Sequence, residues 1–144
     1  MRVRDIGVKE TYCASPSTSL SEVAAMMNKD DIGIVPVCEG KKLLGVITDR
    51  DIVIRCVAAD VNPKECNARE FMTAPAKSIS SYAEIEEAAA LMGREQIRRL
   101  PVVEEGNLVG MISLGDIAIA LNANDALVAQ TLRNISNTAQ ALIA

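Results

Sequence analysis

The stretch that decides the fold is LGVITDRDI, residues 44–52, which returns 65 positions later as VGMISLGDI, residues 109–117. Each stretch opens with apolar residues around a glycine, a composition typical of a strand. Each then has a hydroxyl residue followed three positions later by an aspartate, Thr48 with Asp51 and Ser113 with Asp116. A hydroxyl and a carboxylate at this spacing form a capping box at the start of a helix. Both stretches are therefore predicted to be a strand that leads directly into a helix.

Working outward, the two stretches belong to a duplication of most of the chain. At the same shift, Met27 falls on Met92 and Gly45 falls on Gly110. The period is too long for a solenoid repeat and fits two copies of a small domain, each of which buries little surface alone. We therefore expect two copies that pack together and are followed by a helical tail, at residues 1–64, 65–124 and 125–144.

The same order of elements is predicted in each copy. Apolar residues recur at helical spacing in residues 20–27 and 85–92, ahead of two short apolar strands joined by a polar turn that contains glycine. Pro36 and Pro101 lack a backbone donor, so each is expected at a strand edge or bulge. Pro63 is expected to begin a short helix that carries residues 66–71. The fold class is therefore α+β.

Composition excludes several classes of function. The formal net charge of -4 argues against non-specific nucleic-acid binding, which needs a basic surface. No apolar run approaches the roughly 18 residues of a membrane span, and the N-terminus leads into no signal region. We therefore expect a cytoplasmic protein with neither a membrane nor a nucleic acid as its partner.

Catalysis and metal binding are not indicated either. The chain has no histidine, and its four cysteines form no CxxC pair, so no zinc site is predicted. No serine or cysteine has a visible base partner, and no P-loop or dinucleotide motif is present. The protein is therefore predicted not to be an enzyme.

The repeated motif has two interpretations. The glycine allows another group to approach the backbone, and the hydroxyl with the first amides of the helix suits a phosphate. The aspartate would accept hydrogen bonds from a ribose diol. The alternative is an ordinary helix cap, and because duplication copies caps as well, the spacing alone leaves both interpretations open.

A family resemblance adds to the ligand interpretation. Residues 30–37, DDIGIVPV, with residues 44–52, and their counterparts 96–103, QIRRLPVV, with residues 109–117, resemble CBS domains. The resemblance extends over roughly residues 3–122 and is greatest to small stand-alone bacterial proteins made of two CBS domains. It implies a β-α-β-β-α order in each copy, a pseudo-twofold axis between the copies, and two clefts between their facing sheets. Family members bind AMP, ADP or ATP in such clefts.

The resemblance also implies which residues would bind the nucleotide. The hydroxyl and aspartate would hold phosphate and ribose, the backbone before Pro36 or Pro101 would hold adenine, and basic residues there would contact phosphate. The first cleft would combine Arg98, Arg99, Ser113 and Asp116 with Thr18, Ile32, Gly33 and Ile34. The second cleft would combine Thr48, Arg50 and Asp51 with Ile97 and Arg98.

The two clefts are not equivalent in sequence. Thr18 is matched by Ala83, and Arg98 and Arg99 are matched by Gly33 and Ile34, so the second cleft lacks a hydroxyl and two cations. The first cleft is therefore expected to bind more tightly, since charge-assisted bonds contribute about 1.5–3 kcal/mol each. The alternatives are surface ion pairs of Arg98 and Arg99 with Glu95 or Glu104, and an intrahelical ion pair for Arg50.

Two cysteines form a possible disulfide under the same resemblance. In a CBS domain the segment before the first helix runs alongside the hairpin, which would bring Cys13 near Cys38. A bridge between them would indicate redox sensing, and the alternative is free thiols in a reducing cytoplasm.

The function implied is a regulatory sensor. Binding of AMP, ADP or ATP, with no metal, would bias the arrangement of the copies, and an unknown downstream protein would respond to it. A homodimer is expected, with contacts through the apolar helices that follow each hairpin. The alternative function is a structural or stress- and redox-responsive CBS dimer with no nucleotide bound.

Overall fold

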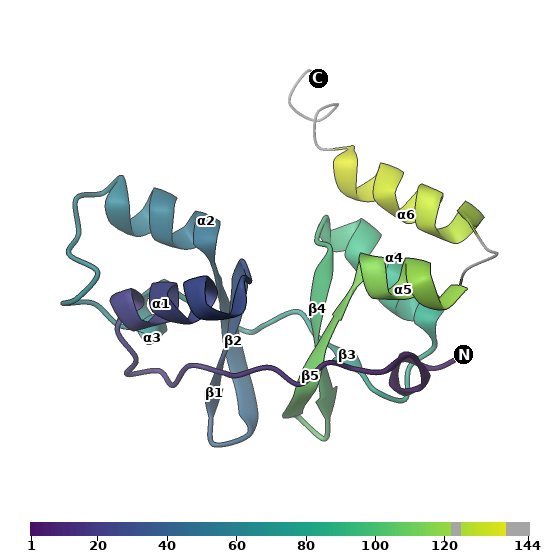
Figure 1. Ribbon diagram of the computed structural model, residues 1–144, viewed down its shortest axis with the longest axis horizontal. Helices are drawn as coiled ribbons and strands as arrows, with labels where there is room; N and C mark the ends of the chain where they lie inside the picture. Colours follow the sequence, from purple (N-terminus) through teal and green to yellow (C-terminus); the bar gives the residue numbers. More distant parts are fainter. Residues whose placement is uncertain (122–124, 138–144) are drawn as a thin grey trace. The chain divides into compact units, whose positions relative to one another are not determined.

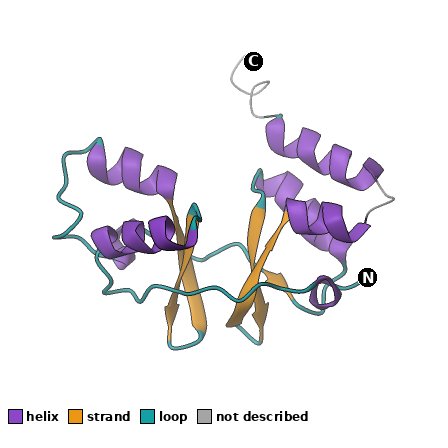
Figure 2. Cartoon of the chain, in the orientation of Figure 1, coloured by secondary structure: helices purple, strands orange, loops and turns teal. Residues whose placement is uncertain are grey.

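The structure is a computed structural model that describes residues 1–121 and 125–137 (Figure 1). The chain divides into two compact units. The copy-one unit consists of residues 12–77 and 106–108, and the copy-two unit consists of residues 1–11, 78–105 and the described residues from 109 onward. Each unit mixes helices with strands, as Figure 2 shows, which confirms the predicted α+β class.

The copy-one unit begins its regular structure at a capped helix. The hydroxyl of Ser19 accepts a hydrogen bond from the Glu22 amide at 3.2 Å, and the helix ends at Asp31 in a left-handed conformation with φ 52°. The elements of this unit are α1 (Leu20–Asp30), β1 (Ile34–Glu39), β2 (Lys42–Thr48), α2 (Asp49–Asp51), the π-helix η2 (Ile52–Val57) and α3 (Ala68–Phe71).

Strands β1 and β2 form an antiparallel hairpin with a register shift between Val37 and Cys38. The extended segment before α1 lies parallel to β1, where Ala14 pairs with Val37. The Ala14 amide donates to the Pro36 carbonyl at 2.9 Å. Pro36 thus takes part in this pairing as an acceptor, and the register shift comes one residue further along the strand.

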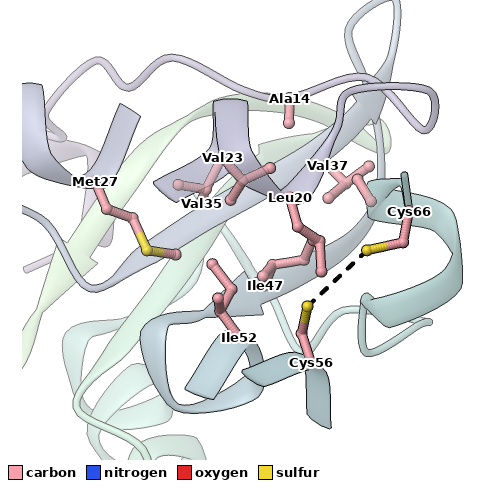
Figure 3. Packing of buried hydrophobic residues seen from close by; sticks show 11 residues of the cluster. Ala14, Leu20, Val23, Met27, Val35, Val37, Ile47, Ile52, Cys56 and Cys66 are labelled. Atoms are coloured by element: carbon pink, nitrogen blue, oxygen red, sulfur yellow. Dashed lines mark hydrogen bonds between the residues drawn. The ribbon is translucent and has the colours of Figure 1, made fainter. Parts of the chain in front are cut away.

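The core of the copy-one unit lies between α1 and this hairpin (Figure 3). It is built from medium-sized aliphatic side chains and two thiols, because the whole chain is only 2% aromatic. Each fully buried aliphatic side chain contributes about 1.5–3 kcal/mol. The largest contributors from the helix and strands are Leu20, Val23, Met27, Val35, Val37 and Ile47.

The copy-two unit repeats the hairpin and its helices. Its elements are the 3-10 helix η1 (Val3–Ile6), β3 (Ile79–Ser80), α4 (Ile85–Glu95), β4 (Arg99–Glu104), β5 (Asn107–Ser113), α5 (Leu114–Leu121) and α6 (Asp125–Ser136). Strand β4 has β5 and β3 as neighbours, and β3 pairs with it in parallel, with Ile79 opposite Val102. This pairing corresponds by position to the pairing of Ala14 with Val37 in the copy-one unit.

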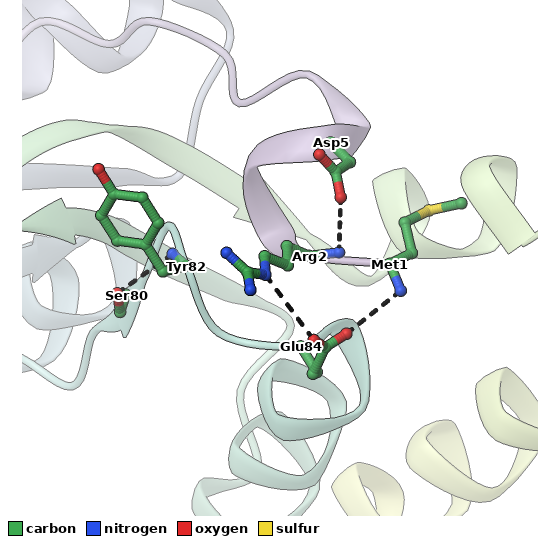
Figure 4. Close-up of polar contacts among 6 residues, drawn as sticks. All are labelled: Met1, Arg2, Asp5, Ser80, Tyr82 and Glu84. Carbon is green, nitrogen blue, oxygen red and sulfur yellow. Dashed lines mark hydrogen bonds and ion pairs between the residues drawn. The ribbon is translucent and has the colours of Figure 1, made fainter.

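The N-terminus packs onto the copy-two unit (Figure 4). The Val3 amide donates to the Ala83 carbonyl at 2.8 Å, and the Val3 side chain is buried. The ammonium of Met1 lies 3.2 Å from Oε2 of Glu84, while Nε of Arg2 lies 3.9 Å from Oε1. The spatial units thus exchange segments relative to the predicted sequence ranges 1–64 and 65–124, since residues 1–11 pack with the second copy and residues 65–77 with the first.

The C-terminal helix α6 packs on its own chain, against α4 and α5. Thr131 is buried on α6 and donates its hydroxyl hydrogen to the Leu127 carbonyl at 2.8 Å. A Cβ at Gly93 of α4 would lie 3.1 Å from Cβ of Asn134. The tail helix expected from Leu127, Leu132 and Ile135 is thus present, whereas Leu142 and Ile143 lie outside the described residues.

The helix expected to start at Pro63 is wrong. Residues 63–65 form a turn, and α3 begins at Ala68. Asn67 caps α3, because its side chain accepts from the Glu70 amide at 3.2 Å and its amide donates to Glu70 Oε1 at 3.2 Å. The start of helix α3 is therefore determined by the capping box at Asn67 and not by Pro63.

Candidate functional site

The repeated hydroxyl–aspartate motif forms a reciprocal capping box in both units. In the copy-one unit, the Thr48 amide donates to Asp51 Oδ2 at 2.9 Å and the Asp51 amide donates to the Thr48 hydroxyl at 3.1 Å. In the copy-two unit, the corresponding distances for Ser113 and Asp116 are 2.8 and 3.0 Å. The motif therefore starts a helix in each copy, and each hydroxyl keeps its own hydrogen for another acceptor.

The glycine of each motif admits protein backbone. A Cβ at Gly110 would lie 2.4 Å from the Lys9 carbonyl oxygen, and one at Gly45 would lie 2.6 Å from the Thr73 carbonyl oxygen. An extended segment pairs with the next residue in both units, Lys9 with Met111 and Thr73 with Val46. The group expected to approach these glycines is therefore a neighbouring strand segment of the same unit.

Lys9 is a charged neighbour of the motif that the sequence did not indicate. Its Nζ lies 3.4 Å from Oδ1 of Asp116, whose side chain is 16% exposed. Burial by itself raises the pKa of Asp116, but the hydrogen bonds from Ser113 and the charge of Lys9 outweigh burial and lower it. Asp116 is thus held ionised, with one oxygen on the helix start and one toward a cation. The contact between Lys9 and Asp116 becomes visible once the structure shows that Lys9 pairs with Met111 of β5.

The backbone before each hairpin is bonded to the start of the following helix. The Asp49 amide donates to the Gly33 carbonyl at 2.9 Å, and the Leu114 amide donates to the Arg98 carbonyl at 2.9 Å. These bonds correspond between the two copies. Within the copy-two unit, this bond places the backbone of Arg98 beside Leu114, the residue that follows Ser113.

Arg98 and Arg99 are exposed, and among the described residues neither forms the alternative ion pair with Glu95 or Glu104. Oε1 of Glu95 lies 3.6 Å from Arg94, and Oε1 of Glu104 accepts the Ser81 hydroxyl at 2.7 Å. Within the part of the chain that the structure describes, neither guanidinium has an ion-pair partner. Two adjacent cations are therefore available to an anion.

The expected nucleotide-binding residues of the copy-one unit offer fewer free polar groups than those of the copy-two unit. Thr48 lies opposite Ile34 in the hairpin. The Thr18 hydroxyl accepts the Ser15 amide at 3.0 Å, so it belongs to a local turn. Arg50 is exposed on α2, and its amide donates to Asp49 Oδ1 at 2.9 Å. Among residues 1–121 and 125–137, no carboxylate pairs with the Arg50 side chain, so the expected intrahelical ion pair is not formed.

The remaining expected residues lie next to these. Ile32 and Pro36 flank Gly33 and Ile34 in the copy-one unit, and Ile97 and Pro101 flank Arg98 and Arg99 in the copy-two unit. The Ile32 amide donates to Met27 and the Ile97 amide to Met92, each at 3.0 Å. Both segments therefore have the same backbone path out of the preceding helix.

All four cysteines are free thiols, in two close pairs. Exposed Cys13 lies beside buried Cys38, and burial, followed by the contact with Cys13, raises the pKa of Cys38 to about 12. The second pair is Cys56 and Cys66, whose sulfur atoms lie 4.0 Å apart. The turn at residues 63–65, where a helix was expected, brings these two thiols together.

The described residues contain no group of three or more Cys, Asp or Glu side chains arranged to hold a metal ion. None of the described helices is both long and apolar enough to cross a lipid bilayer.

Comparison with known proteins decides the family. The CBS domain model matches residues 3–57 and again residues 68–123. The chain belongs to the CBS domain family. Its two copies are CBS domains in tandem, as the resemblance implied.

Two curated relatives are similar over most of their length. The CBS domain-containing protein YhcV of Bacillus subtilis is 35% identical over 135 residues, which cover 94% of this chain and 95% of YhcV. Hypoxic response protein 1 of Mycobacterium tuberculosis is 36% identical over 116 residues, or 80% of this chain and 81% of that protein. Both relatives are thus matched by this chain over most of their own length.

Solved structures agree with the fold. The crystal structure of Hypoxic Response Protein I with two coordinated zinc ions has a TM-score of 0.77 at 35% identity, covering 83% of this chain and 98% of that one. A CBS domain protein from Pyrobaculum aerophilum complexed with AMP has a TM-score of 0.75 at 25% identity, covering 88% of this chain and 100% of that one.

Proposed function

We propose that this CBS pair is a regulatory module, without catalytic activity of its own, that binds AMP, ADP or ATP. The observation that carries the proposal is the exposed pair Arg98 and Arg99, which lacks carboxylate partners among the described residues. The carbonyl of Arg98 accepts the Leu114 amide, so the pair lies beside the start of α5. A phosphate gains from two guanidinium groups and from the first amides of a helix. The AMP complex of the Pyrobaculum aerophilum relative supports the choice of ligand.

The copy-two motif supplies the remaining polar groups. The Ser113 hydroxyl hydrogen is free to donate, since its oxygen is the acceptor in the capping box. Asp116 is ionised, and its Oδ1 lies 3.4 Å from the ammonium nitrogen of Lys9. A ribose diol that donates to this carboxylate would displace the ammonium of Lys9, whose side chain is 77% exposed and held only weakly.

The copy-one motif is proposed as a weaker site. Thr48 and Asp51 form the same box, but Gly33 and Ile34 stand where the copy-two unit has its two arginines. On the helix that follows, Arg50 offers a cation, whereas Arg55 donates to the Phe71 carbonyl at 2.7 Å. Loss of charge-assisted bonds worth about 1.5–3 kcal/mol each would weaken binding by at least tenfold.

Isothermal titration calorimetry with AMP, ADP and ATP tests the proposal. The double variant Arg98→Ala/Arg99→Ala is expected to weaken the tighter site by about 10–100-fold, since two charge-assisted bonds are lost. The matched control is Arg69→Ala, an exposed arginine of the copy-one unit, which is expected to leave both affinities unchanged. The absence of any heat, together with no protection from thermal unfolding at millimolar nucleotide, would overturn the proposal.

Regulation would follow from differential affinity. A nucleotide shifts a conformational equilibrium only as far as it binds one state more tightly than the other. We propose that a downstream protein in the cytoplasm responds to that shift, and that the module works as a homodimer. Exposed apolar side chains on η2, Val53, Ile54 and Val57, support the homodimer.

A second candidate function is a redox-responsive CBS dimer that binds no nucleotide. It is favoured by one observation, the arrangement of all four cysteines in two close pairs. Titration calorimetry separates the candidates, because this alternative predicts no nucleotide heat in either redox state.

A further inference from the structure

Cys56 and Cys66 form a buried dithiol in the core of the copy-one unit. Their sulfur atoms lie 4.0 Å apart, and Figure 3 shows the two side chains pointing toward each other. Cys56 is 0% exposed and Cys66 is 6% exposed. Sulfur atoms in van der Waals contact need to approach by only about 2 Å to form a bond.

The two cysteines come from segments that are anchored differently. Cys56 is on η2, the helix that continues from the Thr48–Asp51 capping box. Cys66 follows a turn, and its carbonyl accepts the Leu20 amide at 3.2 Å, at the start of α1. A covalent link between the sulfurs would therefore tie η2 to the segment that supports the first turn of α1.

The chain between the two cysteines is short and lies at the surface. Residues 58–62 are exposed and contain no helix or strand, and Asp60 has a left-handed conformation with φ 58°. Each thiol has a backbone acceptor in this segment, Val61 for Cys56 and Asn62 for Cys66, both at 3.3 Å. These weak bonds are the polar contacts that bond formation would sacrifice.

We propose that Cys56 and Cys66 are a redox modification site, at which a small hydroperoxide produces an intramolecular disulfide. One thiolate attacks the peroxide oxygen, which gives a sulfenic acid and, for hydrogen peroxide, one water. The second thiol attacks the sulfenic sulfur, forms the S–S bond and releases a second water. Two thiols thus lose two electrons and two protons to one hydrogen peroxide. This site does not depend on nucleotide binding.

Burial slows the reaction of the two thiols with peroxide, so the site responds to sustained oxidation. Desolvation, followed by the hydrogen bond and charge of Cys56, raises the pKa of Cys66, so little thiolate is present at neutral pH. The reaction therefore requires the exposed segment to open, and it accelerates at higher pH. Once formed, the disulfide is shielded by the same core from small-molecule reductants.

Peptide mapping of the oxidised native protein tests the proposal. The reduced protein is treated with excess hydrogen peroxide, remaining thiols are blocked with N-ethylmaleimide, and the chain is digested with trypsin. Cleavage after Arg55, Lys64 and Arg69 puts Cys56 in peptide 56–64 and Cys66 in peptide 65–69. The expected product is these two peptides joined, with a mass about 2 Da below their sum.

The other pair gives an internal comparison, because Cys13 lies in tryptic peptide 10–29 and Cys38 in peptide 30–41. In a Cys13→Ser variant, oxidation is expected to raise Tm by about 5–10 °C through the Cys56–Cys66 link. Adding Cys66→Ser should abolish that rise. Recovery of peptides 56–64 and 65–69 with blocked or singly oxidised thiols, and no joined product from the unmodified sequence, would overturn the proposal.

Discussion

The ammonium nitrogen of Lys9 lies 3.4 Å from Oδ1 of Asp116 and joins the N-terminal segment to the helix start of the second CBS domain. The backbone of Lys9 pairs with Met111 in the same place, donating at 3.3 Å and accepting at 2.9 Å. The other oxygen of Asp116 accepts the Ser113 amide at 2.8 Å. One carboxylate therefore connects the capping box at the start of α5 to Lys9 in the N-terminal segment of the same unit.

Replacing this carboxylate should lower stability in a pH-dependent manner. The pKa of Asp116 is below its ordinary value of 3.8, because hydrogen bonds from Ser113 and the charge of Lys9 outweigh burial, which would raise it. A lowered pKa in the folded state adds stability above the unfolded value, and that stability is lost as pH falls through the folded value. We expect Asp116→Asn to lower the free energy of unfolding by about 1 kcal/mol at pH 7.

Urea denaturation from pH 7 to pH 2.5 measures this effect. The difference between the native protein and Asp116→Asn should shrink once the pH falls below 3.8. The control is Asp60→Asn, at an exposed left-handed position that asparagine accepts, which should change stability by less than about 0.5 kcal/mol. A difference that stays constant across this pH range would contradict the assignment.

A methyl group at Gly110 should displace the N-terminal segment. The new Cβ would lie 2.4 Å from the Lys9 carbonyl oxygen and 2.4 Å from Cγ1 of Val8. Because the first of these atoms is backbone in a paired segment, relief requires the bridge between Lys9 and Met111 to open. We expect Gly110→Ala to cost about 2–3 kcal/mol of unfolding free energy.

The matched control for Gly110→Ala is Gly33→Ala. There the new Cβ would lie 3.0 Å from the carboxylate of Asp49, an exposed side chain that is able to rotate away. The expected cost is below about 1 kcal/mol. Hydrogen exchange of the Met111 amide distinguishes the mechanism, since only Gly110→Ala should remove its protection. Equal costs for the two variants would show that the close approach of residues 8–9 is not what requires glycine.

Those parts of the fold that depend on local pattern were predictable from sequence. The capping boxes at Thr48 and Ser113 and both hairpins follow from spacing and turn residues alone. Because of the duplication, each of these patterns occurs twice in the chain. The α+β class and the CBS family could therefore be predicted from the sequence.

Contacts between distant segments were not predictable in this way. Nothing in residues 1–11 indicates that they pack with the second copy, so the charge of Lys9 beside Asp116 was missed. The Cys56–Cys66 pair depends on a turn after Pro63 where a helix was expected. The two motif glycines were interpreted as access for a ligand, although backbone segments fill both positions. In each case the deciding contact is tertiary.

The apolar surface of η2 should determine whether the proposed homodimer forms. Val53 and Val57 are 55% and 61% exposed. Exposed apolar groups clustered on one helix are typical of an interaction surface. We expect Val53→Glu/Val57→Glu to convert a dimer into a monomer, as measured by light scattering after size exclusion. Val61→Glu, at a 37% exposed valine beyond the helix, should leave the dimer intact.

The packing of α6 on the copy-two unit should depend on Thr131. This side chain is 3% exposed, and its hydroxyl already bonds the Leu127 carbonyl within the helix. An aspartate there would bury a charge where α6 packs on the copy-two unit, so Thr131→Asp should cost about 2–4 kcal/mol. Thr131→Val keeps the shape, loses only a bond within its own helix, and should cost less than about 1 kcal/mol. Thermal unfolding measures both costs, and equal stability of the two variants would mean that α6 contributes no packing energy to the second CBS domain.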